Sequence, residues 1–284
     1  MKPASFTYHA PTTLDEAIAL LAEWAPHEGR VLAGGQSLVP TMAFRVARPA
    51  HLIDINGIAE LSRLSVAGGV LSIGACVRHA AFDSDSIPGP TGTLLRQVVQ
   101  NIAHYPIRAR GTFCGSVANA DPASEWCCAM AALDGVAVAR SRRGERRIAA
   151  ADFYRGIMAT DLAEDELLVR VEIPLLKDDT RSGFREFSRR KGDFAIAMAL
   201  VTYRLVGDRM TEARVAVGGA EDHPRRIGDA EAALEGKPPE AEAFGAAAVA
   251  AAAAVDPLED INNTADYRRG LVGTLVRRAL ESAA

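Results

Sequence analysis

The sequence predicts an α+β protein of two domains, and three observations support this fold class. The chain has 284 residues, a length typical of about two domains. Strand and helix patterns alternate over the first 60 residues, as they do in a β-α-β unit. After residue 183, strand patterns come first and helix patterns last, which favours an antiparallel sheet covered by helices.

The first 60 residues contain two helices with recognisable start signals. Thr13 followed by Glu16 forms a capping box, and apolar residues recur after it at helical spacing. Ser37 follows a Gly-Gly turn and is expected to N-cap the second helix, with Pro40 tolerated in its first turn. The expected elements are a strand at 5–8, a helix from 14, a strand at 30–33, a helix from 37 to 44 and a strand at 51–55.

The next segment, to residue 176, reads as strands with one amphipathic helix. Gly144 lies in a turn between two strand patterns, which predicts a hairpin. Segment 174–183 is polar, begins with Pro and ends with Gly, so we expect the domain boundary there. The expected elements are strands at 70–74, 136–139, 147–149 and 167–173, and a helix at 93–103.

The remainder of the chain predicts a sheet followed by helices. Eight of the nine residues 246–254 are alanine, which indicates a strong helix former lying against a sheet. The expected strands are 184–189, 195–206 and 212–217, and the expected helices are 229–234, 241–255 and 266–283. We therefore predict one domain at 1–176, with subdomains of about 1–60 and 61–176, and a second at 177–284.

Composition and charge exclude several classes of protein. There are 32 Lys and Arg against 36 Asp and Glu, a net charge of −4 that argues against phosphate-driven nucleic-acid binding. No apolar run is long enough to cross a bilayer, and the N-terminus carries no signal-peptide pattern. We expect a cytoplasmic protein without a membrane span.

The cysteines do not form a metal-binding pattern. Cys76, Cys114, Cys127 and Cys128 contain no CxxC pair, which zinc sites and iron–sulfur clusters usually need. They are expected to be reduced thiols in a packed interior, and no metal site is predicted.

Two glycine-rich loops are the strongest candidates for a binding site. One covers residues 32–38 and the other residues 111–125, whereas neither GxGxxG nor GxxxxGK[ST] occurs in the chain. Both offer backbone N–H groups with little side-chain bulk, together with hydroxyls, which suits a pyrophosphate. Each loop alone could equally be a structural turn.

Three ordered motifs carry a resemblance to a known family. They are AGGQSL at 33–38, RxRGTxxGSxANADPASE at 108–125 and RRKGDFA at 189–195. Together they resemble the FAD-binding medium subunit of the molybdenum hydroxylases, a family that includes the carbon monoxide dehydrogenase medium subunit and the flavin domain of xanthine dehydrogenase. The resemblance runs from Phe6 to the Tyr267-Arg268-Arg269 phrase. It implies a bipartite FAD-binding domain of two α/β subdomains, followed by a smaller C-terminal domain of antiparallel sheet and helices.

The resemblance also implies which residues bind FAD, non-covalently, and it implies no catalytic residue. The first loop contributes Leu32, Ala33, Gly34, Gly35, Gln36, Ser37 and Leu38. The second contributes Thr112, Phe113, Cys114, Gly115, Ser116, Ala118, Asn119, Asp121 and Glu125. Residues expected near the flavin rings are Ile102, Leu168, Phe184 and Arg185.

The sequence departs from the family pattern at three places in this set. Cys114 replaces the first Gly of the TxGG pair, and its Cβ would strain a backbone with positive φ. Either the backbone is β-like at Cys114 or a related subgroup of the family tolerates this residue, and a redox or flavin-linked role for Cys114 is a further alternative. Phe184 stands where a shielding aromatic, often Tyr, is expected, and Arg185 follows where Lys is frequent.

The function implied is electron transfer within a larger enzyme. The family member takes electrons from the [2Fe–2S] clusters of a small partner subunit, which receive them from a large molybdopterin subunit, and passes them to an external acceptor. The implied assembly is an (αβγ)₂ heterohexamer. The alternatives are a self-contained flavin oxidoreductase and a non-redox assembly subunit. The substrate is open between CO, an aldehyde, a purine and an N-heteroaromatic compound, with Cys114 inclining toward a heterocycle or aldehyde. The acceptor is open between NAD, a quinone, a carrier protein and oxygen.

Three further features have both structural and functional interpretations. Five arginines (Arg140, Arg142, Arg143, Arg146 and Arg147) flank Gly144 and predict a solvated hairpin tip, or else a partner contact. Residues 191–194 either fold back on the FAD or pack between domains. His104 lies near the flavin or is an ordinary loop histidine.

Overall fold

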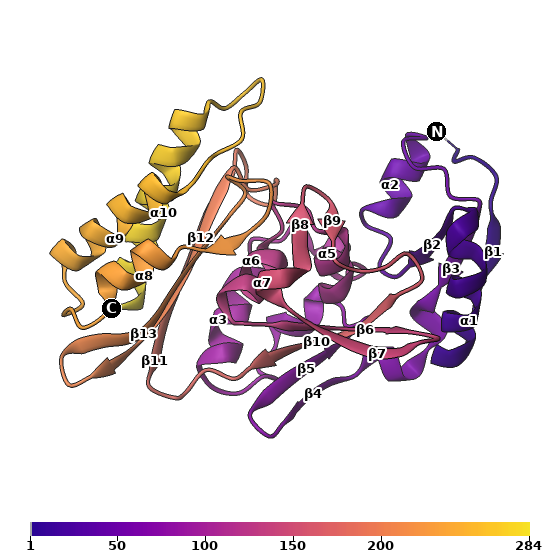
Figure 1. Cartoon of the computed structure of the whole chain (residues 1–284), viewed down its shortest axis with the longest axis horizontal. Coiled ribbons are helices and arrows are strands. Elements are labelled where there is room, and N and C mark those ends of the chain that lie inside the picture. Colours follow the sequence, from indigo (N-terminus) through magenta and orange to yellow (C-terminus); the bar gives the residue numbers. More distant parts are fainter. Residues whose placement is uncertain (1) are drawn as a thin grey trace.

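The computed structural model describes residues 2–284. The N-terminal unit and the C-terminal helices lie at opposite ends of an elongated molecule, with a five-stranded sheet between them (Figure 1). The mixed helix and strand content and the two-part organisation confirm the predicted fold class.

The N-terminal unit is a three-stranded parallel sheet with the order β1-β3-β2. The chain passes through β1 (Thr7–His9), α1 (Leu14–Trp24), β2 (Gly29–Leu32), α2 (Leu38–Ala43) and β3 (His51–Asp54). The predicted cap of α1 is confirmed, because Thr13 Oγ accepts a hydrogen bond from the Glu16 N–H at 3.3 Å. The buried face of α1 consists of Leu14, Ala17, Ile18 and Leu21.

Two details of this unit differ from the prediction. The first strand begins at Thr7 and not at Ser5, because residues 7–9 are the ones that pair with β3. Ser37 precedes α2, but its side chain makes no capping hydrogen bond. Its hydroxyl is therefore not committed to the helix.

The central sheet is antiparallel throughout, with the order β4-β5-β10-β6-β7. The predicted hairpin at Gly144 is confirmed by the pairing of β6 with β7. The strands are β4 (Leu64–Ala67), β5 (Val70–Gly74), β6 (Val136–Ser141), β7 (Gly144–Ala149) and β10 (Leu167–Pro174). A separate two-stranded ribbon is formed by β8 (Tyr154–Gly156) and β9 (Ala159–Thr160).

The helices of this central part differ most from the prediction. The helix expected at 93–103 is α3 (Gly89–Val99), so it starts and ends four residues earlier. The second glycine-rich stretch contains α5 (Phe113–Asn119) and α6 (Glu125–Ala132) instead of one long loop. All eight residues of α6 are buried, so it shows no amphipathic pattern from which a helix could be predicted. The other α-helices here are α4 (Tyr105–Arg108) and α7 (Ala150–Phe153), and 3-10 turns occur at Ala25–His27, Ile55–Gly57, Ala59–Ser62 and His79–Asp83.

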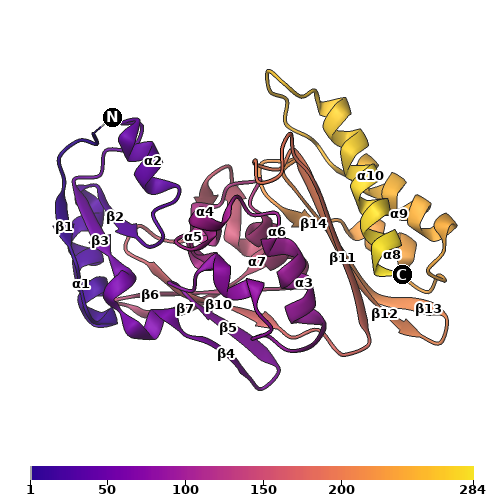
Figure 2. The ribbon, with the colours of Figure 1, turned by 180° about the vertical axis from the view of Figure 1, so that it is seen from behind.

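The C-terminal part is an antiparallel sheet with helices on both faces. Its strands are β11 (Thr180–Phe187), β12 (Ala197–Val206), β13 (Arg209–Gly218) and β14 (Arg225–Arg226), paired in chain order. Figure 2 shows α3 and α6 against one face and α8 (Gly228–Leu234), α9 (Ala241–Ala254) and α10 (Ala265–Ala283) on the other side. Since α6 and α3 belong to the central part, this sheet joins the two halves of the molecule.

The alanine-rich helix α9 packs mainly against α8 and α10, and not directly on the sheet as predicted. The two helices approach closely, because a Cβ at Gly273 of α10 would lie 3.2 Å from the Ala248 carbonyl oxygen of α9. Small side chains allow this spacing. No helix among the described residues is long and apolar enough to cross a membrane.

Candidate cofactor site

A cavity of about 870 Å³ lies where the N-terminal unit meets the central part. Three segments form much of its walls: the turn after β2, the start of α5 and the segment between β9 and β10. This volume is within the range of about 300–1,000 Å³ typical of small-molecule and cofactor sites.

The first loop presents an uninterrupted run of free backbone donors to the cavity. Within residues 2–284, no acceptor is found for the N–H groups of Gly34, Gly35, Gln36, Ser37 and Leu38. All five residues line the cavity. Consecutive N–H groups of this kind form an anion-binding concavity, and they need an external partner to be satisfied.

The two glycines of this loop are required for different reasons. Gly35 has φ +72°, a conformation that side chains with a Cβ rarely adopt. Gly34 is needed for space, because a Cβ there would lie 2.5 Å from the Arg110 carbonyl oxygen and 2.6 Å from Gly111 Cα. The first loop therefore packs directly against the backbone that precedes the second.

Most backbone N–H groups at the start of the second loop donate hydrogen bonds within the chain. Thr112 is the N-cap of α5, and its Oγ1 accepts from the Gly115 N–H at 3.0 Å. The Phe113 N–H donates to the Val77 carbonyl oxygen, and the Ser116 N–H to that of Thr112, both at 3.1 Å. Among the described residues, only Thr112 and Cys114 in segment 111–116 retain N–H groups without an acceptor.

Cys114 is not strained, because its backbone is helical, and neither the strained positive φ nor the β-like conformation considered from the sequence occurs there. It lies in the first turn of α5, outside the positive-φ positions of the chain. Its Sγ donates to the Ile73 carbonyl oxygen at 3.2 Å, and the residue is 2% exposed. Burial raises the pKa of the thiol far above its usual value. Cys114 thus borders the cavity, while its thiol is bonded within the buried core cluster.

His79 is a buried, neutral side chain at the cavity wall. Its Nδ1 accepts from Trp126 Nε1–H at 2.8 Å, so the ring proton is on Nε2. Burial lowers the pKa of His79 to about 4, with further contributions from the charges of Arg78 and Arg108. Its ring supports the second loop, because a Cβ at Gly111 would lie 2.5 Å from His79 Nε2.

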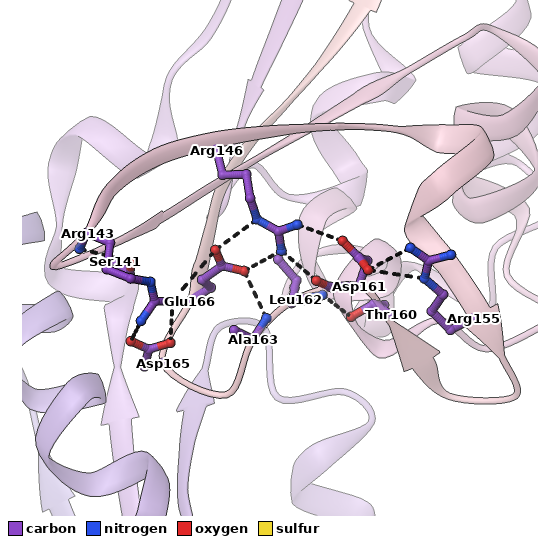
Figure 3. Close-up of polar contacts among 10 residues, drawn as sticks. All are labelled: Ser141, Arg143, Arg146, Arg155, Thr160, Asp161, Leu162, Ala163, Asp165 and Glu166. Carbon is purple, nitrogen blue, oxygen red and sulfur yellow. Dashed lines mark hydrogen bonds and ion pairs between the residues drawn. The ribbon is translucent and has the colours of Figure 1, made fainter.

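The third wall, residues 161–168, is held by arginines of the β6–β7 hairpin (Figure 3). Arg146 donates to Glu166 at 3.0 and 2.7 Å and to Asp161 Oδ2 at 2.6 Å. Arg143 binds both carboxylate oxygens of Asp165, at 2.5 and 2.8 Å. Burial alone would raise the pKa of Glu166, but hydrogen bonds from Arg146 and the Ala163 N–H hold it below its usual value.

The hairpin tip is exposed, as predicted, since residues 142–147 are all exposed, but its arginines also form ion pairs with neighbouring elements. Arg140 pairs with Asp15 of α1 at 2.9 Å, and Arg147 pairs with Glu172 of β10 at 2.6 Å. The arginines therefore join the hairpin to its neighbours. Through Glu166 and the leucines beside it, they fix the wall of the cavity.

Fifteen of the predicted FAD-binding residues line this one cavity, although they lie up to 136 positions apart in the sequence. They are Leu32, Ala33, Gly34, Gly35, Gln36, Ser37, Leu38, Thr112, Cys114, Gly115, Ser116, Ala118, Asn119, Asp121 and Leu168.

Five predicted residues lie elsewhere: Ile102, Phe113, Glu125, Phe184 and Arg185. Phe113 packs against Trp126 with ring centroids 4.8 Å apart, since it occupies the inner face of α5. Ile102 and Phe184 belong to the same buried cluster. Arg185 is exposed on β11. Glu125 is buried at the start of α6, where burial raises its pKa to about 7.

Phe194 lines the cavity, whereas Phe184, the aromatic residue that the resemblance implied, does not. Phe184 is 3% exposed, whereas Phe194 is 75% exposed and lines the cavity. Of the two interpretations of residues 191–194, folding back on the cavity describes Phe194. Gly192 packs beside His104, and a Cβ at Gly192 would lie 3.0 Å from His104 Cε1.

Sequence reasoning missed several other wall residues. His79, Phe44, Val46 and Met158 all line the cavity. Phe44 and Val46 follow α2, the short helix that begins at the end of the first loop, so their nearness to that loop in the sequence was an available signal. His79 and Met158 had no such signal, since only tertiary packing brings them here.

The residues of the cavity fit FAD. The free N–H groups of the first loop match a pyrophosphate, and Gly34 and Gly35 leave its surface without side-chain bulk. Hydroxyl and amide groups on Ser116 and Asn119, together with the apolar Leu168 and Phe194, could accommodate the remaining polar and aromatic parts. No cluster of metal-ligating residues was found in residues 2–284.

Comparisons with known proteins agree with the resemblance. Residues 4–176 match the family described as the FAD binding domain in molybdopterin dehydrogenase, and residues 182–283 match the CO dehydrogenase flavoprotein C-terminal domain. The nicotine 6-hydroxylase medium subunit of Paenarthrobacter nicotinovorans is 36% identical over 283 residues, covering 100% of this chain and 99% of that protein.

Solved structures give the same result. A chain of carbon monoxide dehydrogenase from Hydrogenophaga pseudoflava, in a form lacking the Mo-pyranopterin moiety, matches with a TM-score of 0.95 and 36% identity over 100% of this chain and 98% of that one. A chain of quinoline 2-oxidoreductase from Pseudomonas putida 86 matches with a TM-score of 0.93, 36% identity and the same coverage. This chain therefore belongs to the family of FAD-binding medium subunits of the molybdenum hydroxylases, and it is an FAD-dependent oxidoreductase subunit.

Proposed function

We propose that the chain binds FAD non-covalently in this cavity and serves as the electron-transfer subunit of a molybdenum hydroxylase. The observation that carries the proposal is the run of five free N–H groups from Gly34 to Leu38 along the cavity wall. These donors would hold the FAD pyrophosphate. Cys114, the cysteine in the wall, turns its thiol into the core, which favours non-covalent binding.

The other wall residues would orient the rest of the cofactor. The Ser116 hydroxyl, Asn119 and Asp121 lie on the second loop, where they would bind the hydroxyls of the ribityl chain and ribose. Leu168 and Phe194 supply apolar surface suited to the flavin rings. Because Glu166 is held by Arg146, the wall near Leu168 would keep its shape when FAD binds.

When bound, FAD supplies the redox chemistry, and the protein supplies binding, orientation and electrostatics. The chain would accept electrons from [2Fe–2S] clusters of a small partner subunit and pass them to an external acceptor. All four cysteines are buried, and Cys76, Cys114 and Cys127 donate to backbone carbonyl oxygens, so we place the clusters in the partner subunit. The substrate would be oxidised in a large molybdopterin subunit.

A partner surface is supported by apolar side chains at the cavity. Phe44, Val46, Met158 and Phe194 line it and are 53–81% exposed. Exposed apolar groups in one place favour a binding surface. We propose that the small and large subunits cover this side in an (αβγ)₂ assembly. The domain boundary after residue 176 and a cytoplasmic location remain predictions from the sequence.

The substrate remains open between CO, an aldehyde, a purine and an N-heteroaromatic compound. Relatives at 34–36% identity include proteins named for nicotine, caffeine and carbon monoxide, so identity does not discriminate between these classes. The acceptor likewise remains open between NAD, a quinone, a carrier protein and oxygen.

An anaerobic titration tests the electron-transfer role. Carbon monoxide, glyceraldehyde, xanthine and quinoline would be added in turn to the FAD-loaded chain, alone and reconstituted with its two partner subunits. We expect the visible flavin absorption to bleach with one probe, and only in the complex. Bleaching of the isolated chain would establish a self-contained flavoenzyme, and a purified chain without any FAD would favour a non-redox assembly role.

A further inference from the structure

The two loops at the cavity are joined by a single pair of side chains, Asn56 and Arg78. Asn56 Nδ2–H donates to the Ala33 carbonyl oxygen of the first loop at 2.8 Å. Its Oδ1 accepts from Arg78 Nη2 at 2.7 Å, and Arg78 Nη1 donates to the Arg110 carbonyl oxygen beside the second loop. Each end of this pair therefore holds one backbone carbonyl.

The orientation of Asn56 is determined by its neighbours. Asp54 Oδ1 accepts from both the backbone N–H and Nδ2 of Asn56, at 2.9 and 2.5 Å. Tyr8 OH in turn donates to the other carboxylate oxygen of Asp54 at 2.5 Å. A flipped amide would turn its donors toward the guanidinium and its oxygen toward Asp54, so only the observed orientation satisfies all partners.

The pair crosses the point at which the two loops touch. Gly34 and the Arg110–Gly111 backbone are so close that no Cβ fits between them. The first loop extends from β2 of the parallel sheet in the N-terminal unit, whereas the second loop belongs to the central part of the chain. A ligand that spans both loops depends on their spacing, because hydrogen-bond energy falls steeply with distance and angle.

The guanidinium of Arg78 also remains positively charged next to the cavity. It forms no ion pair within the described part of the chain. The charge of Arg78 acts on His79 in the cavity wall: after burial, it is the next largest cause of the lowered pKa of His79.

We propose that Asn56 and Arg78 are positioning residues that set the spacing of the two loops, so that FAD can engage both at once. The inference rests on the proposal that FAD occupies this cavity. It goes beyond the loops themselves, because neither side chain lines the cavity.

The test measures binding to the deflavinated full-length chain. In Arg78→Met and Asn56→Ala, we expect the Kd for FAD to rise about tenfold or more, as for loss of a hydrogen bond to a charged group. ADP carries the pyrophosphate without the flavin and can rest on the first loop alone, so its Kd should change much less. The two substitutions should not be additive in the double variant, because both break the same bridge. Arg209→Met is the control, since Arg209 also donates to a backbone carbonyl, that of Gly236 at 2.7 Å. It is the first residue of β13 in the C-terminal sheet, to which neither loop belongs.

Arg78→Lys separates spacing from charge. Lysine keeps the positive charge but lacks the forked guanidinium that reaches two acceptors. We therefore expect Arg78→Lys to lose nearly as much FAD affinity as Arg78→Met. Full rescue by lysine would overturn the positioning role and assign the effect to charge. Equal losses for FAD and ADP, with a lowered melting temperature of the apoprotein, would also overturn it. If Arg78→Met keeps wild-type FAD affinity while Gly34→Ala loses FAD, only the positioning role of Asn56 and Arg78 is overturned. If both variants keep wild-type affinity, FAD does not bind in this cavity.

Discussion

The two glycine-rich loops look alike in the sequence but present different groups to the cavity. The first, at 33–38, leaves five consecutive N–H groups free. In the second loop, segment 111–116 uses four of its six N–H groups in the cap and first turn of α5 and in bonds to neighbouring segments. The first loop thus offers backbone donors and the second offers mainly side chains. A glycine-rich pattern by itself therefore does not show whether the backbone is available for a ligand.

The largest expected effect is that of Gly34→Ala in the first loop. A Cβ there would overlap the Arg110 carbonyl oxygen, which lies only 2.5 Å from its ideal position. Either the loops separate or the free N–H groups turn away. We expect FAD affinity to fall about 100-fold, as for an overpacking cost of roughly 3 kcal/mol. Flavin fluorescence titration of the apoprotein measures it.

Gly270→Ala is the matched control for this substitution. Gly270 lies in α10, where a Cβ would meet nothing within 4 Å. It should leave FAD binding unchanged and add slightly to stability, because alanine is the better helix former. Wild-type FAD affinity in Gly34→Ala would show that the first loop is not the pyrophosphate cradle.

The first loop was easier to predict from sequence than the second. The Gly34-Gly35 pair follows a strand pattern directly, and the residues next to it in the sequence line the cavity together with it. The second loop was placed correctly in the sequence, but its helix α5 was not predicted. Thr112 followed by Gly115 lacks the Glu or Gln of a capping box, and the glycine lowers helix propensity.

The residues that act through tertiary packing could not be predicted. Phe184 and Phe194 are ten positions apart, and the register of β11 decides that Phe184 points into the core. Nothing in the sequence distinguishes Arg78 and Asn56 from other polar residues, because only the folded chain places them next to the Ala33 and Arg110 carbonyl oxygens. The ion pairs of the arginines around Gly144 could not be predicted either, because their carboxylate partners lie up to 125 positions away in the sequence.

The next largest effect concerns pH and separates the loops, since His79 supports only the second. Its folded pKa of about 4 lies below the usual value of 6.5. Between these two pH values, His79 binds a proton in the unfolded chain but not in the folded chain. The stability that neutral His79 contributes above pH 6.5 is therefore lost as the pH falls toward 4. Between pH 7.5 and pH 5 this amounts to about 2 kcal/mol.

His79→Gln should remove that share of the pH dependence. We expect the free energy of unfolding to change less between these pH values in the variant than in the wild-type chain, as measured by urea denaturation. A glutamine oxygen can still accept from Trp126 Nε1–H, so the variant is expected to fold. An unchanged pH dependence would mean that His79 is protonated in the folded protein, contrary to its burial.

A smaller effect is expected from Thr112→Val, which removes the cap of α5 but keeps the shape of the side chain. The free energy of unfolding should fall by about 1 kcal/mol, as for loss of an N-cap, and Thr112→Ser should restore most of it. The Kd for FAD should stay within about threefold, because this loop is not expected to bind through its capped backbone. A tenfold or greater rise in Kd without further loss of stability would instead place the Thr112 hydroxyl on the cofactor.

The smallest effect is expected from Cys114→Ala, and it tests which side of the second loop faces the cofactor. Sγ bonds to the Ile73 carbonyl oxygen inside the core, so its removal should cost about 1 kcal/mol of stability and leave the Kd for FAD within about twofold. Since the thiolate is the reactive form and burial raises the pKa of this thiol, iodoacetamide should not modify Cys114 in the folded chain. Mass spectrometry after labelling of the apoprotein and the FAD-loaded protein measures this. Modification of the folded apoprotein that FAD prevents would place the thiol in the cavity, and the second loop would then contribute a redox-capable side chain.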